Sequence, residues 1–238
     1  MLAGYRVVSP EEVGFWPGDF VQVSCYKWLD NRMALMNECI KRCRTQGIPY
    51  VIHPVGYELL KSNKEELEEV REMAMKAGWA LLLHDERTDG ARIHGKDIGR
   101  LWKIINELER HTMLSFENAA STEDAPWFWK TFADSVTVDI GHIEASGFDS
   151  VGYIESLDGD IIEKVHYVHL HRKGPFRSGL IDHWPVKAGC RELDALRVLL
   201  GKRPDARVIL ELNEVEETGE NLNLVRSLWE EVRAQGKT

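Results

Sequence analysis

The chain has 238 residues, with 30 Lys and Arg against 39 Asp and Glu and a formal net charge of −9 at pH 7. This acidic balance does not suggest a protein that binds nucleic acid or a membrane surface through its overall charge. No apolar run approaches the roughly 18 residues needed to span a bilayer. The length predicts one domain over residues 1–238. The first residues lack the basic and apolar regions of a signal peptide, so we expect a cytoplasmic protein.

Eight short, mostly apolar and β-branched runs predict strands. In chain order they are Tyr5–Val8, Phe20–Tyr26, Tyr50–His53, Trp79–His84, Thr112–Glu117, Val136–Asp139, Val165–His169 and Arg207–Glu211. Apolar residues at helical spacing predict helices between most of these runs. They are Arg32–Gln46, a helix opened by a capping box at residues 62–65, about Asp97–Arg110, Ala125–Ala133, Arg191–Leu200 and Leu222–Arg233. Residues Gly147–Leu157 are expected to form a loop or a helical region.

This alternation of strands and helices indicates parallel strands that are covered on both faces. Eight such units close most simply into a (β/α)8 TIM barrel, which typically takes about 250 residues. An open doubly wound sheet is the alternative. That fold would call for a glycine-rich phosphate loop after the first strand, and the sequence has none there.

Six predicted strands end on a side chain that can bind a metal ion: His53, His84, Glu117, Asp139, His169 and Glu211. Two further histidines, His142 and His183, come just after strands. In a barrel, the carboxyl ends of the strands surround one mouth, so these side chains would converge. Side chains two residues back share the same direction, and Ser115, Thr137 and Tyr167 occupy those positions.

A single histidine at a strand end is more often structural than a ligand. Three buried carboxylates at one mouth are different, because unpaired charge resists desolvation and the three would repel each other without a cation between them. Mixed imidazole and carboxylate ligands suit Zn²⁺, Mn²⁺ or Fe²⁺ better than Ca²⁺ or Mg²⁺ alone. The sequence therefore predicts a divalent metal site.

Seven stretches resemble, in order, the xylose isomerase-like TIM barrels, a superfamily that includes sugar isomerases and epimerases and the endonuclease IV family. They are YVIHP, LLLHD, SFENAA, VDIGHIEASGFD, HYVHLH, IDHWPVKAG and VILELN, and they span about Tyr50 to Asn213. The resemblance implies a shared metal site formed by Glu117, Asp139, His169 and Glu211.

In the nuclease branch, the positions of His53 and His84 hold a second zinc together with the shared glutamate, and those of His142 and His183 hold a third. That branch has an aspartate two residues before the His183 position. Here this place is Ile181, with Asp182 adjacent to it, and the end of the same loop is also changed. The resemblance thus implies between one and three ions.

Two activities follow from the resemblance. The first is that of a divalent-metal-dependent isomerase or epimerase of sugars or sugar phosphates. It would act through an enediolate, with Glu117 and Glu211 as the acid and base pair. His142 would bind a substrate hydroxyl, and Arg172 or Lys173 would bind an anionic end of the substrate. The indole of Trp184 would pack against the sugar ring, as that of Trp28 or Trp127 also could.

The second activity is zinc-dependent cleavage of DNA at abasic sites, similar to endonuclease IV. The histidine set favours it. The acidic balance, the short chain and the lack of a basic, aromatic-bearing loop stand against it. Another metal-dependent lyase or hydrolase, or a metal-binding barrel, is a third alternative. Nucleic acid is a partner only in the second reading, and a homodimer is compatible with all three.

Overall fold

The eight strands form one closed parallel barrel in chain order, and β1 pairs with β8 to complete it. The computed structural model describes residues 1–88, 90–174, 182–213 and 215–235. The strands are β1 Ala3–Val7, β2 Phe20–Tyr26, β3 Tyr50–Val55, β4 Ala80–His84, β5 Met113–Glu117, β6 Val136–Asp139, β7 Val165–Leu170 and β8 Arg207–Leu210. The predicted TIM barrel is therefore confirmed.

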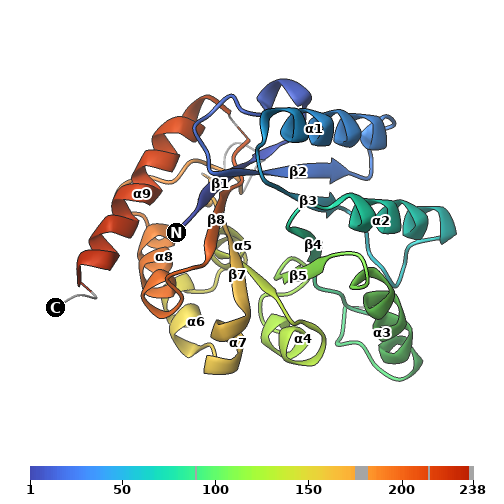
Figure 1. The fold of residues 1–238 in the computed structure, drawn as a ribbon. Helices are drawn as coiled ribbons and strands as arrows, with labels where there is room; N and C mark the ends of the chain where they lie inside the picture. The colour runs from blue at the N-terminus through green and yellow to red at the C-terminus, as the bar shows by residue number, and fades with distance from the viewer. Residues whose placement is uncertain (89, 175–181, 214, 236–238) are drawn as a thin grey trace.

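Helices surround the barrel in chain order, from α1 to α9 (Figure 1). They are α1 Arg32–Gln46, α2 Lys64–Lys76, α3 Lys96–Leu108, α4 Ala125–Phe132, α5 Ile140–Ala145, α6 Ser150–Ser156, α7 Gly159–Lys164, α8 Arg191–Lys202 and α9 Thr218–Gln235, with the 3₁₀ helices η1 Pro10–Glu12 and η2 Val215–Glu217. Only η1 lies between β1 and β2. None of the described helices is long and apolar enough to cross a membrane.

Some element boundaries differ from those predicted. The capping box of α2 begins one residue later, at Asn63, whose side chain accepts the N–H of Glu66 while the Glu66 carboxylate accepts the N–H of Asn63, both at 3.0 Å. Strand β3 continues through Pro54, which is in register with Cys25 of β2. Helix α8 likewise runs through Gly201 and ends before Pro204.

The region after β6 is more helical than the sequence indicates, with α5, α6 and α7 in succession. Helix α5 begins directly at the end of the strand because Asp139 is its N-cap and accepts the backbone N–H of His142 at 2.6 Å. Asp149 caps α6 in the same way. These short helices bring the chain from the mouth of the barrel back to the start of β7.

The barrel interior has two chemically different levels. Near the amino ends of the strands, apolar side chains form a buried group that we call the inner apolar cluster: Phe20, Val51, Ala80, Leu82, Tyr167 and Ile209. Toward the carboxyl ends the buried interior becomes polar. Ser115 and Thr137 are fully buried there, with their hydroxyl oxygens 2.8 Å apart. This polar level supports the mouth.

Candidate metal centre

Four side chains from four neighbouring strands converge at the mouth of the barrel. Glu117, Asp139 and His169 lie at or near the ends of β5, β6 and β7, and Glu211 directly follows β8. Their exposed fractions do not exceed 3%. Asp139 and His169 are register partners across β6 and β7, which explains why these two side chains meet.

The ring nitrogen Nδ1 of His169 lies at the centre of this group, which we call the four-residue cluster. It is 3.0 Å from Glu117 Oε2, 3.7 Å from Asp139 Oδ2 and 3.7 Å from Glu211 Oε2. The opposite nitrogen, Nε2, lies 2.8 Å from the Oε1 of Gln22. Because an amide oxygen can only accept, Nε2 carries a proton, so in the neutral ring Nδ1 would offer its lone pair to a cation among the three carboxylates. Burial lowers the pKa of His169, but without a cation these carboxylates outweigh it and raise the pKa well above its usual value.

Gln22 is a buried polar partner of the cluster that the sequence analysis did not identify. It is fully buried on β2, and its amide nitrogen donates hydrogen bonds to the Glu211 carboxylate and to Ser24. It thereby orients two members of the cluster at once, as partners of metal ligands commonly do. A glutamine between Val21 and Val23 of a predicted strand is the signal that could have identified it.

A second group forms around the same glutamate. The Nε2 atoms of His53 and His84 lie 3.5 and 3.9 Å from Glu117 Oε2. His53 Nδ1 is 3.0 Å from the carbonyl oxygen of Leu82, to which it donates, so its Nε2 offers a lone pair. Glu117 can therefore bridge two positions, one next to His169 and one next to the two histidines.

The remaining two predicted ligands lie beside these groups. His142 Nδ1 is 3.1 Å from Glu117 Oε1, and His183 Nδ1 is 3.0 Å from the carbonyl oxygen of Glu211. The Asp182 carboxylate lies between their Nε2 atoms, 3.9 Å from that of His142 and 4.0 Å from that of His183. Ile181, where the sequence departs from the nuclease pattern, is outside the described residues.

A sixth histidine, His171, was not predicted. It is fully buried, and its Nε2 is 3.1 Å from Asp139 Oδ1. Its position two residues after His169 gives it the same direction as that ligand, so strand alternation could have identified it.

The donors in this region fit a divalent cation. Among the described residues, the buried atoms Glu117 Oε1 and Oε2, His142 Nδ1 and His169 Nδ1 make no hydrogen bond, although several lie 3.0–3.1 Å from one another. Buried polar atoms are normally satisfied. Four overlapping triads have ligand atoms within 4.8 Å of one another: His53–Glu117–His169, Glu117–Asp139–His142, Asp139–His169–Glu211 and His142–His171–His183.

The charges of the carboxylates and imidazoles strongly shift each other's pKa. Burial favours the neutral form of Glu211, but His169 and His183 outweigh it and lower the pKa to about 2. Burial likewise opposes ionisation of His142, yet Asp139 and Glu117 raise its pKa to about 10. For His84 burial dominates and lowers the pKa to about 4. Protons on some histidines therefore balance the carboxylates where a cation would otherwise do so.

The predicted substrate-binding residues lie at the base of the loop that follows β7. Arg172 and Trp184 form an antiparallel bridge, and the Arg172 guanidinium donates to the Pro185 carbonyl at 3.1 Å. The Lys173 ammonium is 3.3 Å from the Glu144 carbonyl. The Trp184 indole packs against Gly174, where a Cβ would lie only 2.0 Å from its Nε1. Their role in binding substrate stays a prediction.

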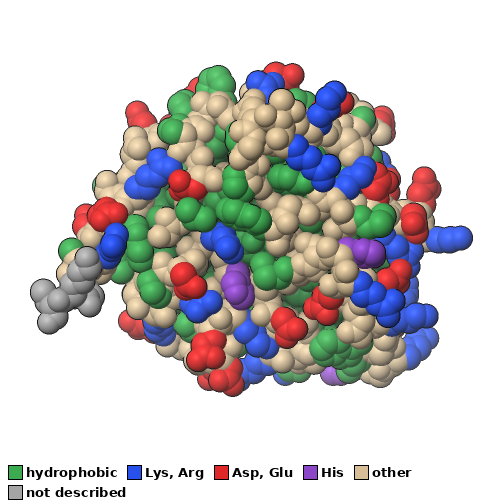
Figure 2. Space-filling model, in the orientation of Figure 1, with side chains coloured by type: hydrophobic (Ala, Val, Ile, Leu, Met, Phe, Trp, Pro, Cys, Tyr) green, Lys and Arg blue, Asp and Glu red, His purple; other side chains and the backbone are tan. Residues whose placement is uncertain are grey.

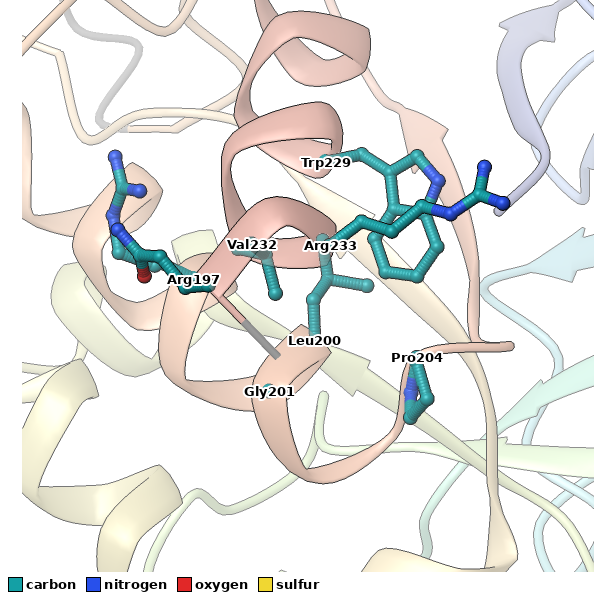
Figure 3. Close-up of a pocket in the computed structure, with 8 residues that line it drawn as sticks. Arg197, Leu200, Gly201, Pro204, Trp229, Val232 and Arg233 are labelled. Carbon is teal, nitrogen blue, oxygen red and sulfur yellow. The ribbon is translucent and has the colours of Figure 1, made fainter. Parts of the chain in front are cut away.

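Other surface features lie away from this centre. Figure 2 shows basic and acidic side chains interspersed over the face in view. A surface cavity between α8 and α9 is lined by Arg197, Leu200, Gly201, Pro204, Trp229, Val232, Arg233 and Gln235 (Figure 3). Because Pro204 precedes β8, this cavity lies at the amino end of the barrel, opposite the mouth. It contains no imidazole or carboxylate side chain that could join the cluster.

Known structures share this fold. A D-tagatose 3-epimerase-like protein aligns with a TM-score of 0.71 and 15% identity over 99% of each chain. For the 3-keto-D-glucoside 4-epimerase YcjR from E. coli, the TM-score is 0.59 and the identity 12%, over 95% of this chain and 99% of that chain. A xylose isomerase-like TIM barrel protein from Mycobacterium smegmatis, in complex with magnesium, has a TM-score of 0.59 and 12% identity, over 94% and 86%.

The barrel therefore has the xylose isomerase-like TIM fold, as the sequence motifs indicate. No protein-family model and no curated protein sequence matches the chain. Two of the structural neighbours are described as sugar epimerases, and another is described as similar to one.

Proposed function

We propose that this protein is a divalent-metal-dependent isomerase or epimerase of a sugar or sugar phosphate. The observation that carries this proposal is the position of His169 Nδ1, which has oxygens of three buried carboxylates within 3.7 Å. Glu117, Asp139, His169 and Glu211 would hold the cation. A bound divalent cation supplies stabilisation of negative charge on a substrate oxygen.

The protein's own residues would move the proton. Glu117 ends β5 and Glu211 follows β8, three strands further around the barrel mouth, so the two carboxylates approach the centre from different directions. One would accept a proton from the carbon next to the substrate carbonyl, and the other would return a proton, so that the reaction passes through an enediolate. His142, whose Nδ1 faces Glu117 and Asp139, would hydrogen-bond a substrate hydroxyl.

The net charge of the proposed centre favours an uncharged part of the substrate, such as sugar hydroxyls, next to the metal. The three carboxylates are buried together. With neutral imidazoles, one divalent cation leaves the centre one charge negative, which suits a polyol better than a phosphate. Two divalent cations would make it one charge positive and would attract a phosphate group.

Phosphodiester hydrolysis is the second candidate, because His53 and His84 both face Glu117 Oε2 and supply a second cation position. Two cations would activate water and clamp the phosphate. In this reading the substrate is a nucleic acid with an abasic site, and Zn²⁺ is the expected metal. In the first reading Mn²⁺, Zn²⁺ and Fe²⁺ all suit the mixed donors.

Metal content and two activity assays separate the candidates. Elemental analysis of the purified protein should find close to one Mn²⁺, Zn²⁺ or Fe²⁺ per chain for an isomerase, and two or more for the hydrolase. Ketoses and their phosphates are then tested for deuterium uptake from solvent at the carbon next to the carbonyl. In parallel, a DNA duplex with one abasic-site analogue is tested for cleavage. Cleavage without deuterium uptake would reverse the ranking, and a protein that binds no divalent metal would exclude both.

The variant Glu211→Gln tests the role of the second glutamate. It removes a proton-transferring group but keeps the side chain's shape, so we expect a folded protein without deuterium-exchange activity. Glu216→Gln, an exposed neighbour, is the control and should keep full activity. Turnover that persists in Glu211→Gln would remove this residue from the acid and base pair.

A further inference from the structure

His171 has hydrogen-bond partners at both ring nitrogens. Its Nδ1 accepts the backbone N–H of His183 at 2.9 Å. Because Nδ1 uses its lone pair in this way, the proton of the neutral ring is on Nε2. Nε2 lies 3.1 Å from Asp139 Oδ1 and 3.2 Å from Oδ2, so it donates to this carboxylate. The backbone of His183 thus determines the tautomer that His171 presents to Asp139.

The ring of His171 is also fixed sterically. It lies against Gly141, where a Cβ would be 2.1 Å from the Cε1 atom of the ring. On another side the imidazole of His183 lies with its centroid 4.3 Å away. His183 is held at φ +59°, in the left-handed region that non-glycine residues rarely adopt. The ring therefore has little freedom to turn, and only glycine fits at position 141.

These contacts hold the orientation of the Asp139 carboxylate. Oδ1 accepts the backbone N–H of His142 at 2.6 Å, and the His171 Nε2 lies near both oxygens, 3.1 Å from Oδ1 and 3.2 Å from Oδ2. Oδ2 is the oxygen that faces His169 Nδ1, at 3.7 Å, and His142 Nδ1, at 3.4 Å. Partners that hydrogen-bond a ligating carboxylate orient it toward the cation position.

We infer that His171 is a positioning residue that orients the Asp139 carboxylate for metal binding and couples that orientation to the backbone of the loop at His183. The inference rests on the proposed metal centre. It differs from a ligand role, in which His171 would coordinate a cation together with His142 and His183, whose ligand atoms lie within 4.8 Å. Coordination would require His171 to give up one of its two hydrogen bonds.

Two amide substitutions at position 171 distinguish the roles of the two ring nitrogens, Nδ1 and Nε2. In His171→Asn, the amide oxygen can take the place of Nδ1 and accept the His183 N–H, but no donor reaches Asp139. In His171→Gln, the amide nitrogen can take the place of Nε2 and donate to Asp139. Each metal-free variant and the wild type are titrated with Mn²⁺ and with Zn²⁺, which gives the dissociation constant and the number of ions bound. A thermal unfolding curve of each metal-free protein verifies the fold.

We expect His171→Asn to weaken metal binding about 10- to 100-fold with the number of ions unchanged, the range found when a partner of a ligand is lost. His171→Gln should restore affinity to near the wild-type value. Loss of one whole ion in both variants would show a direct ligand and overturn the inference, as would unchanged affinity in His171→Asn. A wild type that binds neither ion would instead refute the metal centre itself. If His171→Asn does not fold, Gly141→Ala displaces the same ring and should weaken binding in the same way.

Discussion

The two levels of the barrel interior have the same backbone geometry and opposite chemistry. Four residues of the inner apolar cluster are each followed, two positions later on the same strand or just after it, by a residue of the mouth. The pairs are Val51 and His53, Leu82 and His84, Tyr167 and His169, and Ile209 and Glu211. Alternation gives both members of a pair the same inward direction.

The difference lies in what each level requires. The apolar side chains are satisfied by contact with one another, because burial removes their surface from water. The side chains of the mouth cannot satisfy one another in this way, since three carboxylates and several imidazoles share a small buried volume. The inner apolar cluster therefore stabilises the fold without a ligand. The charged side chains of the mouth are stable together only when protons or cations balance their charges.

The largest effect is expected for Glu117→Gln. Glu117 faces His53, His142 and His169, and its loss removes a ligand as well as a proton-transferring group. We expect the activity to fall by roughly 10²- to 10⁴-fold and metal binding to weaken strongly, while the protein stays folded. Isothermal titration with Mn²⁺ and deuterium exchange measure the two effects.

The control for this variant is Glu163→Gln, an exposed carboxylate on α7 at the other end of the barrel. It should change neither quantity. If the two variants behaved alike, the mouth would not differ in function from an ordinary surface carboxylate.

Ile209→Ala is the matching change in the inner apolar cluster. Ile209 is fully buried, and deleting its side chain leaves a cavity, so the free energy of unfolding should fall by about 2–5 kcal/mol. Metal affinity of the folded variant should stay near the wild-type value. Urea unfolding of the metal-free protein and a Mn²⁺ titration verify both parts. A variant as stable as the wild type would contradict the assignment of this level to fold stability.

A smaller effect is expected from pH on metal binding. Burial lowers the pKa of His142, but Asp139 and Glu117 outweigh it and raise the pKa to about 10, so the ring is charged in the metal-free protein at pH 7. A cation bound by Glu117 and Asp139 neutralises the charge that raises this pKa, so its binding releases the proton. Apparent affinity should therefore rise as pH increases from 7 toward 10, by about tenfold per pH unit for each proton displaced.

The pH effect on stability has a definite sign. The raised pKa of His142 stabilises the metal-free fold below the ordinary histidine pKa of 6.5, and this stabilisation is lost as pH rises through 10.

His84, with its pKa lowered to about 4 by burial, is already neutral at pH 7 and releases no proton when a cation binds. Titration calorimetry of metal binding, repeated in buffers of different ionisation enthalpy, gives the number of protons released per cation bound. His142→Ala should release about one fewer, whereas equal release would contradict the assigned proton.

The smallest effect is expected for Lys173→Ala. Lys173 follows β7 and belongs neither to the inner apolar cluster nor to the metal-binding side chains of the mouth. If the Lys173 ammonium binds an anionic substrate end, KM should rise by about tenfold for a phosphorylated sugar and remain unchanged for its unphosphorylated form. Lys187→Ala, an exposed lysine of the same connection, is the control. An equal increase in KM for both substrates would indicate a general effect on the loop instead.

The sequence by itself determined the barrel and the direction of its side chains. Short β-branched runs between amphipathic helices predict eight parallel strands, and the structure has all eight, with most ends within one or two residues. Because a strand alternates with period two and a closed barrel brings all carboxyl ends to one mouth, the convergence of the predicted ligands was also predictable.

Only the tertiary structure decided how these side chains meet. Gln22 and His171 act through contacts with residues more than thirty positions away or on other strands, and no local pattern specifies such a partner. The left-handed backbone of His183 and the close packing of Gly141 against a ring likewise depend on the assembled barrel. Local periodicity determines where a side chain points, but its tautomer, its hydrogen-bond partner and the orientation of its donor atoms depend on neighbours that only folding brings together.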